Sequence, residues 1–141
     1  MIAIDTNVLL RYLLEDDPKQ SPKAKKLIIK HHPALLTDVV LVETIWTLMG
    51  KRYSIEKADI CAIVRSLIGD GGFVFEDYQV IWGTLRDYEE SKAVRGKKLD
   101  FSDALIANKA RHSAAAKGVE LSGFYSFDKA TEQLEGAIPF N

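Results

Sequence analysis

Two kinds of hydrophobic pattern alternate along the chain: short apolar runs, and longer stretches in which apolar residues recur every three or four positions. The short runs predict buried strands, and the longer stretches predict amphipathic helices. Strands are expected over 1–4, 34–37, 73–76 and 123–127, with a short edge strand over 137–140. Helices are expected over 8–17, around 24–28, and over 39–49, 55–68, 78–94 and 102–117.

Residues that favour helix ends fit these boundaries. Pro18 and Gly50 would stop the helices before them, while Asp38 and Ser54 are expected to serve as N-caps. Strands that alternate with helices are typical of an α/β fold. We therefore predict a three-layer α/β/α arrangement with a mostly parallel central sheet, and 141 residues suit a single domain over 1–141.

The composition narrows the class of protein without identifying an activity. Hydrophobic residues make up 47% and charged residues 28%, which is typical of a globular domain and excludes a disordered chain. The net charge of −1 provides no overall positive field, so binding to nucleic acid would need a local basic patch. Cys61 is the only cysteine, which excludes an internal disulfide, and it is expected to fill a buried helix face.

We expect neither a secretion signal nor a membrane anchor in this chain. Its first apolar run lacks a preceding basic segment and is interrupted by Asp5. No apolar run approaches the roughly 20 residues that span a bilayer. A single cysteine also agrees with a reducing compartment. We expect a cytoplasmic protein that does not contact a membrane.

Four apolar runs each contain a single carboxylate, at Asp5, Glu43, Asp103 and Asp128. A charge that is removed from water costs several kcal/mol, roughly, unless it is paired, hydrogen-bonded or bound to a metal. Helical spacing places Glu43 on a stripe with Trp46, so we expect Glu43 to face packed protein. Asp103 is likewise expected to point inward. Since ligands bind at the carboxyl ends of parallel strands, all four acids could converge there.

Local roles are the alternative for three of these acids. Asp5 could close an Asx-turn after its strand, and Asp128 could be the N-cap of a short helix. Asp103 could be a first-turn acid that interacts favourably with the positive end of the helix dipole, with Asp100 as the N-cap. Glu43 is explained least well in this way.

Several carboxylates in one crevice would suit Mg²⁺ or Mn²⁺, which prefer oxygen ligands. Histidine and cysteine are too scarce for a zinc site. Carboxylate sites that hold such ions catalyse in-line phosphoryl chemistry. Hydrolysis of a nucleic acid is the activity that these residues favour.

The segments that carry these acids occur in a characteristic order, IDTNVLLRYLLEDD, VVLVETIWTL, DFSDALIA and YSFDKA. Together they resemble the PIN-domain proteins of the VapC toxin group over nearly the whole chain. The resemblance implies a PIN-like fold and a metal-dependent endoribonuclease. Its acidic quartet falls on Asp5, Glu43, Asp103 and Asp128, with Asp5 and Asp103 as the principal ligands of Mg²⁺ or Mn²⁺. Glu43 would bind the metal or orient a water, and Asp128 would complete the site or hold a second ion.

The same resemblance implies supporting residues. Thr6 and Asn7 would support the first acid, with Asn7 hydrogen-bonded in the site. Ser126 stands where the family usually has a threonine two positions before the last acid, and it retains the hydroxyl. Asp100 occupies a position that is often acidic. Basic side chains near the acids are candidates for contacts with RNA phosphates, against a generic role at the surface: Arg11, Arg95, Lys97 and Lys98.

VapC toxins are typically neutralised by a small antitoxin of the VapB kind, whose arginine could pair with the carboxylates. The resemblance therefore implies an RNA substrate and such an antitoxin, and we expect a homodimer. Six apolar residues could serve a partner or a homodimer face, or belong to the core: Leu48, Met49, Ile60, Ile63, Val64 and Leu67.

Other classes of protein remain open. A haloacid-dehalogenase-like phosphatase also begins with an aspartate after its first strand, but expects a second aspartate where this chain has Asn7. A receiver domain needs its phosphoacceptor at a central strand end, and a binding module would not need all four acids. PIN domains also occur in RNA-processing nucleases outside toxin–antitoxin systems.

Overall fold

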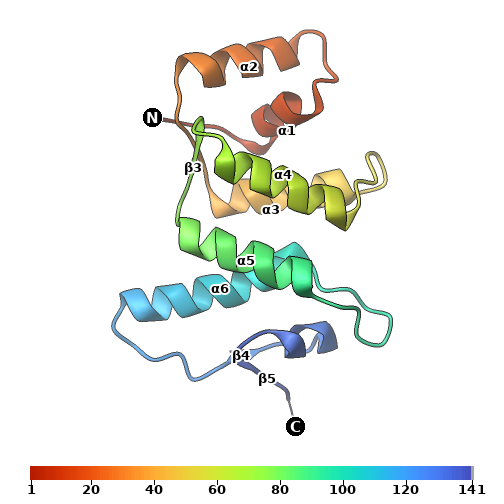
Figure 1. The fold of residues 1–141 in the computed structure, drawn as a ribbon, viewed down its shortest axis with the longest axis vertical. Coiled ribbons are helices and arrows are strands. Elements are labelled where there is room, and N and C mark those ends of the chain that lie inside the picture. Colours follow the sequence, from red (N-terminus) through yellow and green to blue (C-terminus); the bar gives the residue numbers. More distant parts are fainter. Residues whose placement is uncertain (141) are drawn as a thin grey trace. The chain divides into compact units, whose positions relative to one another are not determined.

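The computed structural model describes residues 1–140, and the chain forms two compact units that divide at the start of one helix, after Tyr78. We call them the N-terminal unit, Met1–Tyr78, and the C-terminal unit, from Gln79 onward, and describe each by itself. The N-terminal unit contains β1 (Ile2–Ala3), α1 (Thr6–Leu14), α2 (Gln20–Lys30), β2 (Ala34–Leu36), α3 (Asp38–Met49), α4 (Lys57–Gly69) and β3 (Phe73–Phe75) (Figure 1). Helix α5 (Tyr78–Glu90) begins at the division. The C-terminal unit continues with α6 (Phe101–Ala116), β4 (Phe124–Tyr125), the 3-10 helix η1 (Lys129–Gln133) and β5 (Ala137–Ile138).

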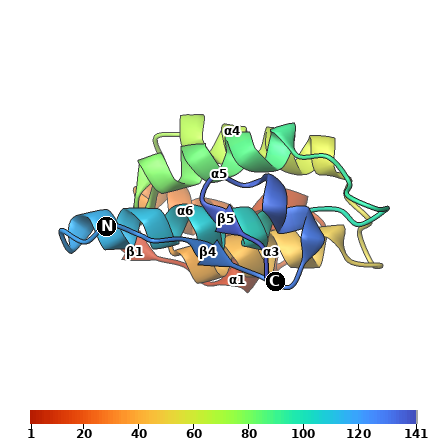
Figure 2. The same cartoon turned by 90° about the horizontal axis from the view of Figure 1, so that it is seen from below.

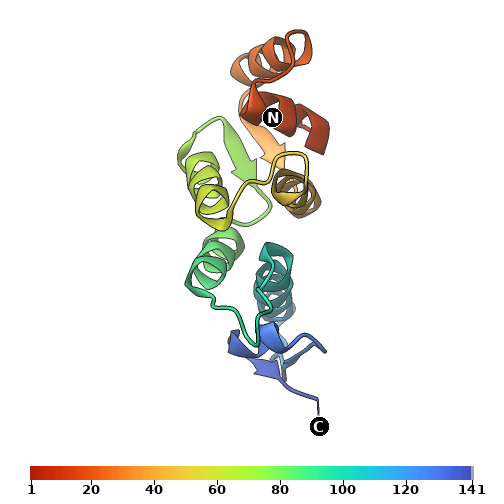
Figure 3. The ribbon, with the colours of Figure 1, turned by 90° about the vertical axis from the view of Figure 1, so that its right-hand side faces the viewer.

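The N-terminal unit is built on a parallel three-stranded sheet in the order β1-β2-β3. Ile2 pairs with Ala34, and Ala34 pairs with Phe73. Figure 3 shows the β2 and β3 arrows side by side, with α4 near them. Ala34, Leu36 and Phe73 are almost completely buried, as expected for strands of a parallel sheet that helices cover.

The core of this unit is made by the apolar stripes of its helices. Leu9 of α1, Leu41 of α3 and the pair Ile60 and Val64 of α4 have at most 1% of their surface exposed. Cys61 is also buried on α4, which confirms the expected packing role. Four of the six apolar residues that could have served a partner are buried and belong to the core: Leu48, Ile60, Val64 and Leu67.

The C-terminal unit packs its core between α5, α6 and the residues after them. The rings of Tyr88 and Phe101 meet edge to face with centroids 5.5 Å apart, and both are buried. The two-stranded sheet is parallel, with Phe124 opposite Ala137, and Figure 2 shows β4 and β5 side by side. Gln133 of η1 exchanges hydrogen bonds with the backbone of Lys92, at 2.9 and 3.0 Å. These bonds fasten the loop after α5 to the C-terminal segment.

The predicted class, α/β with a parallel sheet, is confirmed, and the three-layer arrangement and the single domain stay predictions. Some boundaries were wrong. Helix α1 ends at Leu14 rather than Asp17, because Glu15 adopts a left-handed conformation with φ 52°. Helix α5 ends at Glu90 rather than Val94. The predicted strand over 123–127 is shortened to Phe124–Tyr125 and pairs with β5 rather than with the main sheet.

Two predicted N-caps were also wrong. The cap of α3 is Thr37, whose hydroxyl accepts from the Val40 N–H, and Asp38 is already helical. Helix α4 is capped at Glu56, while Ser54 lies in the preceding turn with φ 50°. Within residues 1–140, no helix is both long and apolar enough to cross a membrane.

Candidate active site

Asp5 links the first strand to the first helix. It is exposed, and its Oδ1 accepts a hydrogen bond from the Val8 N–H at 3.0 Å, which makes Asp5 the N-cap of α1. A carboxylate at this position satisfies one of the N–H groups that a helix start leaves unpaired, and it is favoured by the helix dipole. The cap fixes the direction of the side chain while it engages only one of the two carboxylate oxygens.

Glu43 lies on the solvent face of α3, so the prediction that it faces packed protein was wrong. The buried stripe of this helix is formed by Leu41, Ile45 and Leu48, and the opposite face leaves Trp46 80% exposed. Glu43 shares that opposite face because residues three positions apart lie on the same side of a helix. Nearly every position of α3 around it is apolar, so the sequence pattern did not define which side would be buried.

Thr6 brings the first acid and Glu43 into one neighbourhood. Its hydroxyl donates to Glu43 Oε2 at 2.9 Å, across 37 positions of sequence, and Thr6 directly follows Asp5. A hydrogen bond to a carboxylate orients it and favours its ionised form. The N-terminal unit therefore holds Asp5, Thr6 and Glu43 close together, with the Thr6 hydroxyl on Glu43 rather than on Asp5, the first acid that the resemblance implied it would support.

Two further acids lie at the carboxyl ends of the neighbouring strands. Glu76 follows β3, and its Oε2 accepts from the N–H of Asp38, which follows β2, at 2.6 Å. Neither residue was among the predicted site residues. Their position directly after parallel strands is the signal that would have identified them, since ligands gather at that edge.

Asn7 and Arg11 turn toward a different part of the N-terminal unit. The Asn7 amide donates to Gln20 Oε1 of α2 at 3.5 Å, rather than to an acid. Arg11 pairs with Asp16 at 2.8 Å, which raises the pKa of the guanidinium, and its side chain is 16% exposed. The pairing neutralises much of the charge that Arg11 was expected to offer to RNA.

Asp103 is the acid with the most perturbed environment. It lies half-buried in the first turn of α6, and its Oδ2 accepts from the N–H of the N-cap residue Asp100 at 3.1 Å. Burial raises the pKa of the Asp103 carboxyl. The negative charges of Asp100 and Asp128 raise it further, while the hydrogen bond from Asp100 and the positive charge of Lys97 oppose that change. A bound cation would offset the repulsion between these carboxylates, which lie near one another and partly out of water.

Asp128 is held by a tight turn. Its Oδ1 accepts from the Ala130 N–H at 2.9 Å, so it is the N-cap of η1, as one of the alternatives anticipated. The hydroxyl of Ser126 accepts from the Asp128 N–H at 3.0 Å, and the hydroxyl of Thr131 donates to the Asp128 carbonyl at 2.6 Å. Ser126 therefore supports the backbone of the last acid.

A basic hairpin lies beside Asp103 in the C-terminal unit. Val94 and Lys97 exchange backbone hydrogen bonds of 2.9 and 3.0 Å around Arg95 and Gly96, which both have positive φ angles of 53° and 78°. Two central residues with positive φ are typical of a type I′ turn. The turn projects from the chain between α5 and α6 (Figure 1) and leaves Arg95, Lys97 and Lys98 exposed. The sequence identified these residues as basic but did not predict that Lys97 would approach Asp103.

The donor chemistry of these residues fits a hard divalent cation, because every candidate ligand is a carboxylate and two of them repel each other. Among residues 1–140, no three Asp, Glu, His or Cys side chains gather closely enough to form a metal site by themselves. The structure thus brings Thr6 to Glu43 in the N-terminal unit, and Asp100, Lys97 and Asp128 close to Asp103 in the C-terminal unit, while the quartet as a whole stays a prediction.

A similar solved structure is that of VapC20 of Mycobacterium tuberculosis, a toxin that cleaves the sarcin-ricin loop. The two chains are 21% identical, 97% of each is covered, and the TM-score is 0.40. No curated protein matches this chain.

The sequence profile of the PIN domain matches residues 2–134, which include the four candidate acids and both compact units. This is most of the 141-residue chain. The chain therefore belongs to the PIN domain family.

Proposed function

We propose that this protein is a metal-dependent endoribonuclease and the toxin of a VapBC-type pair. Membership of the PIN domain family supports a nuclease in preference to a haloacid-dehalogenase-like phosphatase or a receiver domain. The observation that carries the proposal is Asp103, a half-buried carboxylate whose pKa is raised by burial and by two neighbouring acids, with a basic hairpin beside it. Such perturbed groups are concentrated at functional sites.

In this proposal Asp5 and Asp103 are the principal ligands of Mg²⁺ or Mn²⁺, and Glu43 and Asp128 complete the set. The ion supplies electrostatic stabilisation of the charge that develops on the phosphodiester. The carboxylates hold it, and the hydrogen bond from Thr6 fixes the direction of Glu43. Asp100 orients Asp103 through its backbone N–H, and Ser126 holds the turn that presents Asp128.

The reaction is hydrolysis. A water attacks phosphorus, the bond between phosphorus and the leaving ribose oxygen breaks, and that oxygen takes up a proton. Glu43 would accept the proton from the attacking water, because it is exposed and held at one oxygen by Thr6, and the leaving oxygen would take its proton from solvent. Lys97 and Lys98 contact the phosphates that flank the scissile bond, since both are exposed on the hairpin beside Asp103.

The proposed partners are RNA, a small VapB-like antitoxin and a second copy of the chain. An arginine of the antitoxin would pair with the ionised carboxylates bidentately and so compete with the metal. A PIN nuclease that acts in RNA processing, without an antitoxin, would use the same residues and is the second candidate. Co-purification of a small partner encoded beside this chain would separate the two.

The test is cleavage of a panel of RNAs by the purified chain, freed of any partner, with Mg²⁺ or Mn²⁺ and with a chelator. Asp103→Asn removes the central carboxylate at almost constant volume. Glu120→Gln is the matched control, because Glu120 is an exposed acid of the same unit that lies outside the candidate site.

We expect cleavage that needs metal, that Asp103→Asn abolishes and that Glu120→Gln retains. Metal-independent cleavage, or equal cleavage by both variants, would contradict the proposal. Circular dichroism of each variant would verify that lost cleavage does not reflect lost folding.

A further inference from the structure

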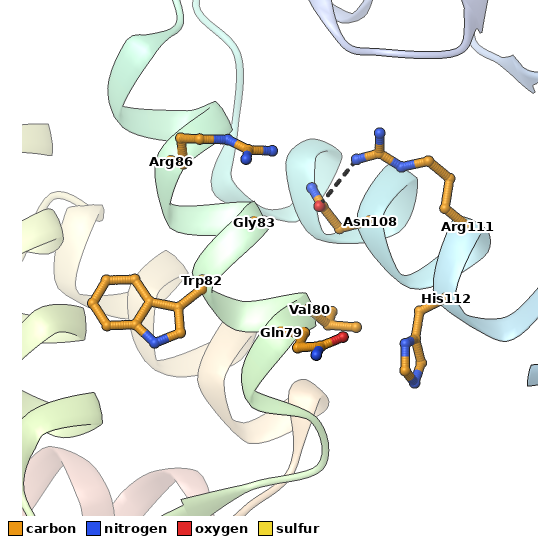
Figure 4. Close-up of a pocket in the computed structure, with 8 residues that line it drawn as sticks. All are labelled: Gln79, Val80, Trp82, Gly83, Arg86, Asn108, Arg111 and His112. Atoms are coloured by element: carbon orange, nitrogen blue, oxygen red, sulfur yellow. Dashed lines mark hydrogen bonds between the residues drawn. The ribbon is translucent and has the colours of Figure 1, made fainter. Parts of the chain in front are cut away.

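A groove of about 580 Å³ lies between α5 and α6 of the C-terminal unit (Figure 4). Gln79, Gly83 and Arg86 of α5 form one side, and Asn108, Arg111 and His112 of α6 form the other. None of these residues was singled out by the sequence analysis. Its volume is much larger than one phosphate, and its lining combines the apolar side chains of Val80 and Trp82 with these polar and cationic groups.

The floor of the groove is a fixed contact between the two helices. A side chain at Gly83 would collide with Asn108 Oδ1, so the absence of a Cβ lets α6 approach α5 closely. Glycine in a helix interior costs about 1 kcal/mol relative to alanine, which this packing offsets. Asn108 is only 8% exposed and donates to Asp87 Oδ2 at 2.9 Å and to the Ala104 carbonyl at 2.8 Å.

Two guanidinium groups lie at one end of this floor, on either side of a single carboxylate. Asp87 is 3.4 Å from Arg86 and 3.7 Å from Arg111, and it is largely buried between them. Arg111 also donates to Asn108 Oδ1 at 3.0 Å and to Glu135 at 2.7 Å. Glu135 is 80% exposed, so solvent screens its charge strongly. The two arginines and the two carboxylates balance each other in formal charge, and Arg86, the more exposed of the two arginines, presents the guanidinium that is most open to solvent.

The other end presents planar polar groups. In Figure 4 the Gln79 amide and the His112 ring face each other across the groove, while Arg86 extends toward α6 above them. An amide and an imidazole offer donors and acceptors of the kind that recognise the edges of nucleobases. Guanidinium groups bind phosphate and also stack on bases.

We propose that this groove binds a phosphate and an adjoining base of single-stranded RNA, away from the bond that is cut. The inference rests on the proposed nuclease function and names a further contact with its substrate. Asn108 and His112 follow Asp103 on α6 by five and nine positions, which corresponds to roughly 8 and 14 Å along the helix axis. The same spacing turns Asn108 and His112 to a different side of α6 from Asp103. An RNA strand bound in the groove would therefore occupy a different side of this helix from the Asp103 carboxylate.

Binding of a fluorescently labelled single-stranded RNA, measured by anisotropy with the full chain in chelator, tests this inference without cleavage. Arg86→Ala removes the exposed guanidinium and leaves the contacts of Arg111 in place. We expect about tenfold weaker binding, as for a lost hydrogen bond to a charged group. The dependence of log K on log salt should become shallower by about one unit.

Arg65→Ala is the matched control, because Arg65 is an exposed arginine on α4 of the N-terminal unit. It should change the affinity less than about twofold if the effect of Arg86 is local rather than a general loss of charge. Equal weakening by both variants, or none by Arg86→Ala, would overturn the inference.

Binding of inorganic phosphate and of a mononucleotide shows whether the groove prefers RNA to smaller anions that carry the same phosphate group. We expect the RNA to shift the NMR resonances of Gly83 and Arg86 at concentrations at which inorganic phosphate leaves them unchanged. If inorganic phosphate or the mononucleotide binds as tightly as the RNA, the groove is a small-anion site and the inference is overturned.

The outcomes also distinguish the groove from the nuclease. If the wild type cleaves RNA with metal and Arg86→Ala binds RNA as well as the wild type does, the proposed nuclease activity stands and RNA binding in the groove is overturned. Binding that depends on Arg86 in a chain that cuts no RNA would support the groove and contradict the proposed activity.

Discussion

The acids of the two compact units meet opposite electrostatic conditions. Asp5 and Glu43 are exposed, and their nearest polar partners are neutral, the Val8 N–H and the Thr6 hydroxyl. Asp103 is half-buried, and its charged neighbours include two other acids. Carboxylates that are crowded together and partly removed from water repel each other. Under the proposed function, the N-terminal unit would contribute oriented carboxylates, and the C-terminal unit would hold the carboxylate that a cation would stabilise most.

The largest expected effect tests whether both units serve the reaction. Asp5→Asn in the N-terminal unit and Asp128→Asn in the C-terminal unit should each lower kcat for RNA cleavage by about 100-fold or more, because each removes a carboxylate of the quartet. Single-turnover cleavage at saturating metal measures this effect. Full activity in either variant would show that the substituted carboxylate takes no part in the chemistry.

The hydrogen bond from Thr6 predicts a smaller, separate effect. Thr6→Val keeps the shape of the side chain and removes the donor to Glu43, so we expect kcat to fall about tenfold with little change in KM. Thr6→Ser should restore most of the rate. Thr47→Val is a matched control, because the Thr47 hydroxyl donates to the Glu43 backbone carbonyl instead. If Thr47→Val lowers the rate as much as Thr6→Val does, the effect reflects helix packing and not the hydrogen bond to the Glu43 carboxylate.

Stability sharpens the comparison further. The raised pKa of Asp103 means that the folded chain holds this proton at pH values where the unfolded chain has lost it. Stability therefore falls as pH rises from about 3.9, the unfolded value, through the raised folded pKa. In metal-free protein at neutral pH, Asp103→Asn should raise Tm by about 2–4 °C, a gain that solvent screening keeps small.

Asp5→Asn should leave Tm within about 1 °C of the wild type, because asparagine is an equally good N-cap. The gain from Asp103→Asn should disappear below pH 3.9, roughly, where the carboxyl is protonated in both states. Thermal unfolding of both variants across this range measures the difference. A lower Tm for Asp103→Asn at neutral pH would show that its carboxylate stabilises the fold.

The smallest effect concerns the basic hairpin. Lys97 lowers the pKa of Asp103, so Lys97→Ala should raise that pKa and move the acidic limb of the pH–rate profile to higher pH. The rate at neutral pH should fall by about two- to fivefold, as expected for one exposed charge. Lys117→Ala, at the other end of α6, provides the comparison. An unchanged acidic limb in Lys97→Ala would separate the hairpin from Asp103.

Local patterns predicted most of the secondary structure and the local roles of the acids. The apolar run at Phe73–Phe75 forms a strand of the parallel sheet, and Asp128 caps the short helix that follows it in sequence. Asp100 is the N-cap of α6, as one of the alternatives anticipated. These features depend on neighbours in sequence or on alternation, which a single chain displays directly.

The side of α3 that carries Glu43 could not be predicted, because apolar residues surround it on the helix. The buried stripe includes Thr44, while Val39 and Trp46 are exposed, so hydrophobicity alone indicated the wrong face. Burial of a helix face is decided by the elements that pack against it, which the sequence of the helix does not contain.

Contacts that depend on the path of the backbone between elements could not be predicted from the sequence either. The approach of Lys97 to Asp103 depends on a turn with two positive φ angles, and the groove depends on Gly83 meeting Asn108. Each is a tertiary contact between residues that have ordinary local explanations. By contrast, the positions of Asp38 and Glu76, directly after strands of a parallel sheet, are visible in the sequence.

The central claim is that the four carboxylates of both units bind a divalent cation together. Mn²⁺ binding followed by electron paramagnetic resonance tests it most directly, on the wild type, Asp5→Asn, Glu43→Gln, Asp103→Asn, Asp128→Asn and the control Glu120→Gln. All four site variants should bind Mn²⁺ more weakly, and the control should bind like the wild type. If only the variants of the C-terminal unit lose affinity while Asp5→Asn and Glu43→Gln keep it, the claim that the acids act together is contradicted.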